Sequence, residues 1–271
     1  MSAKKLLRAF SAALLCAVFA SGVCAGILTH YSYSRQFREA PSAAPSAQHP
    51  LGTDHLGRDL LARLLYGTRV SLLLAPAAAL LATLIAGLFG GIAGLWGGWM
   101  EKAILAAADL SLGLPLLFVL IALRALLPLA ISPVISVVAT FLTLGILGWP
   151  ASLRVVWAAA RRYRNSDFLL LARAGGCSPS RILLRHVMPN LLPVLLAQFW
   201  ISIPLFILTE ATLSMLGLGV MEPLPSWGTL LKGLEDLTAV RANPWMLSPL
   251  LVLIAVVISL QLILPAREEA L

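Results

Sequence analysis

The run SLLLAPAAALLATLIAGLFGGIAGLW, residues 71–96, decides the fold, because it is long, apolar and free of charged side chains. A helix needs about 20 predominantly apolar residues to cross the hydrocarbon core of a bilayer. Lipid offers the backbone no hydrogen bonds, so a run of this length satisfies its own polar groups as a helix. It is rich in Leu and Ala and lacks the alternating polarity of a membrane β-strand. The run therefore predicts a transmembrane helix.

The composition extends this prediction to the whole chain. Of 271 residues, 59% are hydrophobic and only 12% are charged, and the mean hydropathy is +0.91. So few polar side chains cannot cover a soluble globule of this size. Five further apolar runs occupy residues 9–29, 103–127, 131–149, 191–216 and 246–264. The predicted fold class is an all-α integral membrane protein with about six transmembrane helices.

The N-terminal part allows two interpretations. Lys4, Lys5 and Arg8 precede an apolar run that could be a secretory signal peptide with a cleavage site near residues 23–25. The run is long enough to span a bilayer and further spans follow, which favours an uncleaved anchor. The stretch REAPSAAPSAQHP, residues 38–50, has the composition of a flexible linker.

A short amphipathic helix on the membrane surface is predicted next. Thr53 or Asp54 could cap it, with leucines on one side and charged residues on the other. The leucines are Leu60, Leu61, Leu64 and Leu65, and the charged residues are Arg58, Asp59 and Arg63. We therefore divide the chain into residues 1–68, with the anchor, linker and surface helix, and residues 69–271, the transmembrane domain.

The net charge of +8 indicates contact with membrane lipid and disfavours nucleic-acid binding, because most Lys and Arg lie in loops between apolar runs. The densest positive cluster comprises Arg154, Arg161, Arg162, Arg164, Arg173, Arg181 and Arg185. Cytoplasmic loops carry an excess of such residues. We expect both termini and this cluster to be cytoplasmic. The excess of positive charge on that side is reduced, but not reversed, by five arginines on the other side: Arg35, Arg38, Arg58, Arg63 and Arg69.

The stretch DFLLLARAGGCSPSRILLRHVMPN, residues 167–190, is polar and punctuated where the rest of the chain is apolar. A helix over residues 154–174 should end at Gly175-Gly176, Ser178 can cap a second helix, and Pro179 suits the first turn of that helix. Leu169, Leu170 and Leu171 could insert into a groove on a soluble partner. The alternative is a basic loop held only by lipid headgroups.

At these residues the sequence resembles the permease subunits of ABC importers, whose cytoplasmic coupling loop carries the EAA motif. ARAGGCSPSRILLRHVMPN looks like that motif, with Gly176 at its glycine, although Leu170-Leu171-Ala172 stands where many members have Glu-Ala-Ala. HPLGTDHLGRDLLARLLYGTRVSL, WGGWMEKAILAAADLSLGLP and EATLSMLGLGVMEPLPSWGTLL narrow the resemblance to the second permease subunit of the dipeptide, oligopeptide and nickel branch.

The resemblance implies the type I ABC importer permease fold, with a coupling loop over residues 152–190 in the bacterial inner membrane. It implies a heterodimer with a homologous permease subunit, two cytoplasmic ATPase subunits that bind ATP and Mg, and an external solute-binding protein. No cofactor is implied in this chain itself. The implied ATPase-coupling residues are Asp167, Leu170, Ala172, Arg173, Ala174, Gly176, Ser178, Arg181, Arg185, His186, Pro189 and Asn190.

Other functions were weighed against this one. The chain has no phosphate-binding loop, zinc-protease motif or hydrolase nucleophile motif, so we expect no enzyme activity and no catalytic residue. A metal site at His49, Asp54 and His55 is disfavoured. An ion-coupled secondary transporter would use Asp109, Arg124 and Glu210 near the membrane. For Asp109 and Glu210 we expect bonds to neighbouring helices instead.

Overall fold

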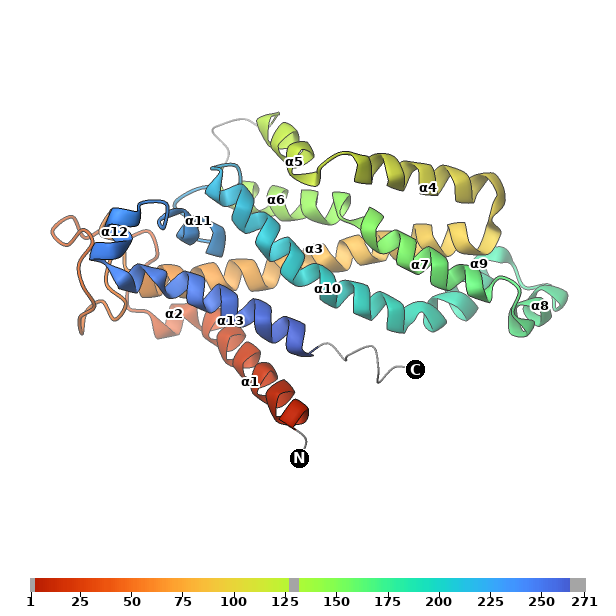
Figure 1. Ribbon diagram of the computed structural model, residues 1–271, viewed down its shortest axis with the longest axis horizontal. Helices are drawn as coiled ribbons and strands as arrows, with labels where there is room; N and C mark the ends of the chain where they lie inside the picture. The colour runs from red at the N-terminus through yellow and green to blue at the C-terminus, as the bar shows by residue number, and fades with distance from the viewer. Residues whose placement is uncertain (1–2, 127–131, 264–271) are drawn as a thin grey trace. The chain divides into compact units, whose positions relative to one another are not determined.

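The computed structural model describes residues 3–126 and 132–263, which are mostly helical (Figure 1). The chain divides into two compact units. Unit 1 comprises residues 1–75, 127–140 and 204–271, and unit 2 comprises residues 76–126 and 141–203. The described helices are α1 (Ala3–Val23), α2 (Ala25–Leu28), α3 (Leu60–Trp96), α4 (Gly98–Gly113), α5 (Leu116–Ala125), α6 (Pro133–Leu147), α7 (Trp149–Tyr163), α8 (Asp167–Ala174), α9 (Pro179–Arg181), the π-helical η1 (Ile182–Val187), α10 (Met188–Met215), α11 (Trp227–Lys232), α12 (Leu237–Ala242), the 3₁₀ helix η2 (Pro244–Leu247) and α13 (Ser248–Ile263).

Five stretches are long and apolar enough to cross a membrane, and a bent helix pair would make a sixth. The five stretches are Lys4–Val23, Leu60–Trp96, Pro133–Tyr163, Pro179–Met215 and Pro244–Ile263. This confirms the predicted all-α membrane class with about six spans.

The bent pair replaces the single straight span predicted over residues 103–127. Helix α4 ends at Gly113 and α5 begins at Leu116, and the two are bent by 85°. Leu114 has extended backbone angles because it precedes Pro115, whose ring disfavours a helical conformation at the residue before it. The predicted end at residue 127 and the next predicted start at residue 131 lie outside the described residues.

Unit 2 has a core of buried apolar side chains from the end of α3, α7, α8, η1 and the start of α10. Its members are Leu95, Val156, Ala160, Leu169, Ile182, Leu183, Val187, Leu191 and Leu195. Glycines of α3 allow this packing: a Cβ on Gly94 would lie 2.6 Å from Ala160 Cβ, and one on Gly91 would lie 3.0 Å from Leu183 Cδ1. Small residues at a helix interface allow such a close approach of two backbones.

In unit 1, α1 packs beside α13. The predicted surface amphipathic helix is wrong, because α3 begins at Leu60 and continues without a break to Trp96, through the predicted division at residues 68 and 69. Its charged residues Arg58, Asp59 and Arg63 are buried. The residue at the start of the helix is Asp59, whose Oδ2 accepts the Ala62 N–H at 2.7 Å, so neither Thr53 nor Asp54 caps it.

The segment before α3 is held by hydrogen bonds, so the prediction of a flexible linker is also wrong. The Phe37 N–H donates to Gly57 O at 2.8 Å, and the Ser42 N–H donates to Asp54 O at 2.9 Å. The Thr53 hydroxyl donates to Ala40 O at 2.6 Å and accepts the Ala43 N–H at 2.8 Å. The Pro/Ala/Ser composition therefore builds a folded loop.

Candidate functional site

The stretch singled out in the sequence forms a hairpin of short helices in unit 2, which we call the hairpin (residues 164–190). In Figure 1, α8 and α9 lie at the end of α7. The predicted continuous helix over residues 154–174 is wrong, because α7 ends at Tyr163 and α8 begins at Asp167. Ser166 lies between them in extended conformation, and its hydroxyl donates to Tyr163 O at 2.6 Å.

The turn after α8 has the geometry of a Schellman motif. The helix ends at Ala174, and Gly176 has a positive φ of 73°. The Gly176 N–H donates to Arg173 O and the Cys177 N–H donates to Ala172 O, each at 3.0 Å. These two bonds satisfy carbonyls that a helix end leaves free. The predicted termination by the two glycines is therefore confirmed, and Gly176 is the glycine in the left-handed region.

The second arm begins at Pro179, as the sequence predicts, but the prediction that the Ser178 side chain caps it is wrong. Pro179 lies in the first turn of α9, and Ser178 occupies the N-cap position with extended backbone. The Ser178 side chain makes no capping hydrogen bond; its hydroxyl lies 3.4 Å from Ser180 Oγ. The π-helical η1 then leads into α10, and Asn190 Nδ2 donates to His186 O at 2.6 Å.

One side of α8 is buried and the other is exposed. Leu169 is completely buried in the unit 2 core, so its predicted insertion into a partner is wrong. Its neighbours face outward: Phe168 is 38% exposed, Leu170 49% and Leu171 73%. We call these three side chains the apolar face. A short helix anchored by one leucine thus presents three large apolar side chains that are partly or mostly exposed, although the ring of Phe168 also packs edge-on against Tyr163.

The remaining predicted site residues lie along the same hairpin. Asp167, Ala172, Arg173 and Ala174 lie on α8, Arg181 on α9, Arg185 and His186 on η1, and Pro189 and Asn190 on α10. Ala172 and His186 are half-buried, and the others in this group are exposed. The hairpin therefore brings them to one surface segment, but it gathers no constellation of nucleophile, base and orienting group.

A family model described as "Binding-protein-dependent transport system inner membrane component" matches residues 86–267, which include the hairpin. The chain belongs to this family. The oligopeptide transport system permease protein OppC of Bacillus subtilis is 34% identical over 86% of this chain and 72% of that protein. The dipeptide transport system permease protein DppC of Bacillus subtilis is 31% identical over 86% and 70%. OppC of Mycobacterium tuberculosis is 33% identical over 96% and 88%.

These findings confirm the resemblance to ABC importer permeases. A secondary transporter would instead use two carboxylates, Asp109 and Glu210, whose contacts the structure shows. In the permease, Asp109 of α4 forms an ion pair with Arg154 of α7, with both side chains about half exposed. The side chain of Arg124 lies outside the described part of the structure. Asp109 therefore links two helices of unit 2.

Glu210 is fully buried in α10 of the permease. Its Oε1 accepts hydroxyl hydrogen bonds from Ser214 at 2.6 Å and from Ser226 at 2.7 Å. Ser226 is also the N-cap of α11, in a capping box with Thr229. Glu210 thus ties the end of a membrane helix to the start of α11, in unit 1.

A second polar cluster of the permease escaped sequence reasoning. Glu222 accepts hydrogen bonds from Arg58 Nη1 at 2.6 Å and Arg63 Nη2 at 2.8 Å. The side chains of Arg58 and Arg63 are only 5% and 2% exposed, and Glu222 is 49% exposed. Asp54 Oδ2 accepts the Arg58 Nε–H at 2.7 Å. We call these four residues the Glu222 clamp.

The two arginines of the clamp lower the pKa of Glu222. Burial by itself raises the pKa of Glu222, but hydrogen bonds and charge from Arg63, followed by those from Arg58, outweigh it and hold the pKa below the ordinary value of 4.5. His49 Nδ1 lies 2.8 Å from Asp59 Oδ1 beside this cluster. Among the described residues, no three His, Cys, Asp or Glu gather to hold a metal. The clamp joins the loop before α3 to the loop after α10.

Proposed function

We propose that this permease is one of two membrane-spanning subunits of an ATP-driven importer of peptides. Peptides are favoured over nickel or metal chelates because the similar proteins from Bacillus and Mycobacterium are named for oligopeptide and dipeptide transport. Its partners are a homologous permease subunit, two cytoplasmic ATPase subunits that bind ATP and Mg, and an external solute-binding protein. Residues 69–271 supply the pathway, and this chain hydrolyses nothing itself.

The observation that carries the proposal is the apolar face on a rigidly anchored helix. Burying a large apolar side chain is worth about 1.5–3 kcal/mol, so Phe168, Leu170 and Leu171 favour a partner with a complementary groove. The buried Leu169 and the core beneath it transmit any displacement of α8 to α7 and η1. An ATPase that moves this face therefore moves the membrane helices.

The departure from the EAA pattern has a consequence for that groove. Leu170 and Leu171 stand where many family members have Glu-Ala, and both are exposed. A carboxylate contact is therefore replaced by apolar surface. We expect the ATPase groove facing α8 to be lined with apolar side chains at these two positions.

The proposal is tested at Gly176, for which the hairpin offers a matched control. A Cβ on Gly176 would meet nothing within 4 Å, so its requirement is the positive φ alone. Gly175 has a φ of −76°, which any residue adopts. Gly176→Val should cost about 1–3 kcal/mol locally, Gly176→Asn less because Asn tolerates this conformation, and Gly175→Ala little.

The measurements are uptake of labelled peptide and recovery of subunits in a pull-down on the tagged permease. We expect Gly176→Val to reach the membrane, bind the partner permease and lose ATPase recovery and uptake, with Gly176→Asn intermediate. Normal ATPase recovery and normal uptake in Gly176→Val would remove the coupling role from the hairpin. Loss of the partner permease as well would indicate general misfolding, which the Gly176→Asn variant separates from a local effect.

A further inference from the structure

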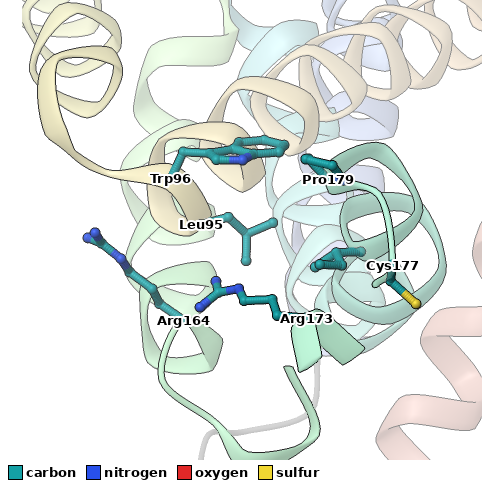
Figure 2. A pocket seen from close by; sticks show the side chains of 7 residues that line it. Leu95, Trp96, Arg164, Arg173, Cys177 and Pro179 are labelled. Carbon is teal, nitrogen blue, oxygen red and sulfur yellow. The ribbon is translucent and has the colours of Figure 1, made fainter. Parts of the chain in front are cut away.

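Beneath the hairpin lies a basic pocket with a volume of about 410 Å³, in the range of about 300–1,000 Å³ typical of small-molecule sites. Its walls come from the ends of α3 and α7 and from α8, α9 and η1. Figure 2 shows Arg173 extending beneath Leu95 toward the base of Arg164, whose guanidinium points away from that of Arg173, with the ring of Trp96 above and the sulfur of Cys177 directed away. All of these elements belong to unit 2.

Among the described residues, the guanidinium groups of Arg164 and Arg173 are the only charged groups that line the pocket. Within the described residues, no carboxylate lies in ion-pair distance of Arg164 or Arg173, whereas Arg154 pairs with Asp109 and Arg161 with Glu101. Arg164 passes close to Gly97, where a Cβ would overlap its guanidinium. Gly97 has a φ of 65°, a conformation that favours glycine. Among the described residues, the pocket therefore presents two guanidinium groups without a carboxylate partner.

The pocket also lies among the ends of candidate membrane spans. Three apolar spans end at its walls: Leu60–Trp96 at Trp96, Pro133–Tyr163 next to Arg164, and Pro179–Met215 at Pro179. Trp96 is 37% exposed, and tryptophan is enriched at the level of lipid headgroups. Leu95, Pro179 and Ile182 add apolar wall beside the two cations.

We propose that this pocket binds the phosphate of an anionic phospholipid headgroup. The planar guanidinium fork matches phosphate oxygens, and basic pockets between transmembrane helices on the cytoplasmic side suit such headgroups. The glycerol part of the lipid packs against Trp96 and the apolar wall. A bound headgroup bridges the ends of α3, α7 and α9 and so braces the hairpin. The proposal rests on membrane placement and not on the transported solute.

The test titrates short-chain phosphatidylglycerol into the detergent-purified transporter and follows the unfolding temperature. Arg164→Gln/Arg173→Gln is compared with Arg181→Gln/Arg185→Gln, which removes two exposed arginines of the same hairpin outside the pocket. The half-saturating lipid concentration should rise roughly 10–30-fold in the pocket variant and less than threefold in the control. Arg164→Lys/Arg173→Lys, which keeps both charges, should retain most of the affinity.

Each of the following outcomes would overturn the proposal. Equal stabilisation by phosphatidylcholine would show that the headgroup charge is irrelevant. Equal stabilisation by inorganic phosphate at matched concentration would identify a free-anion site. Equal loss in the Arg181/Arg185 control would indicate general surface charge. A pocket variant that binds lipid normally but loses ATPase recovery would assign the two arginines to an acidic partner segment. If Arg164→Gln/Arg173→Gln does not fold, the Lys variant decides: its failure to bind phosphatidylglycerol counts against the site.

Discussion

Truncation of Glu222 tests the energetics of the clamp. In Glu222→Ala, Arg58 and Arg63 lose their shared acceptor while their side chains stay almost completely buried. Removing one partner of a fully buried ion pair costs about 3–5 kcal/mol, and an exposed pair is worth about 0–1 kcal/mol. Glu222 is half exposed and Asp54 still accepts from Arg58, so the cost lies between these limits. We expect about 2 kcal/mol.

The assay is loss of the monodisperse peak of the fluorescently tagged, full-length permease after heating, measured by size-exclusion chromatography. A matched control is Glu235→Ala. Glu235 lines a cavity that Arg58, Arg63 and Glu222 also line, and among the described residues it has no ion-pair partner. Glu222→Ala should lower the midpoint by roughly 4–8 °C, and Glu235→Ala should change it little.

A double-mutant cycle separates the pair from its surroundings. Glu222→Gln and Arg63→Gln are made singly and together, and the coupling between them should be about 1–2 kcal/mol. The effects of substitutions at independent sites add to within about 0.5 kcal/mol. A coupling energy below that value would show that Glu222 and Arg63 do not act as a unit. So would a Glu235→Ala variant as unstable as Glu222→Ala.

Three further predictions follow from the structure. Because the folded pKa of Glu222 is lower than its ordinary value of 4.5, the stability advantage of wild type over Glu222→Gln should be complete above that value and vanish as pH falls through the lower folded pKa; an advantage that grew on acidification would contradict this sign. Ser226→Ala should destabilise the permease by about 1–2 kcal/mol and Glu210→Gln by less, since the amide oxygen still accepts, with no change in the transported peptide; altered substrate choice in a stable Glu210→Gln variant would assign Glu210 to the pathway. In a background without Cys16, Cys24 and Cys177, which are at least partly exposed, an impermeant thiol reagent applied to intact cells should label cysteine at Leu237 but not at Lys4 or Arg162; labelling at Arg162 would reverse the orientation.

The parts of the fold that the sequence predicted are those encoded by nearby residues. The turn of the hairpin depends on Gly176 and Pro179, and the bonds of the Schellman motif join residues within six positions of each other. The spans depend on unbroken apolar runs. The break at Pro115 was missed although its signal is local: a proline disfavours helix at the residue before it, and the apolar composition on both sides hid that signal.

The parts that could not be predicted depend on distant partners. Arg58 and Arg63 have the spacing of an exposed helix face, and they are buried because Glu222, 164 and 159 positions away, neutralises them. No periodicity in residues 53–65 contains that information.

The hairpin combines both kinds of information, which fits the coupling role proposed for it. Its turn is specified locally, so its shape would persist when a partner moves it. Its position is specified by Leu169, which belongs to the same buried core cluster as Val156 of α7 and Leu183 of η1. A hairpin that had the turn but lacked the core contacts would move without displacing the helices. A hairpin that had the core contacts but lacked the turn would change shape when a partner pushed on it. Under the coupling role proposed above, this core would carry a displacement of the apolar face to α7 and to the start of α10. A substitution such as Leu169→Ala should therefore reduce peptide uptake while ATPase recovery stays closer to normal, because it leaves Phe168, Leu170 and Leu171 in place and weakens only their connection to the core by about 2–5 kcal/mol. Equal loss of uptake and ATPase recovery in this variant would show that the connection and the docking face are not separable.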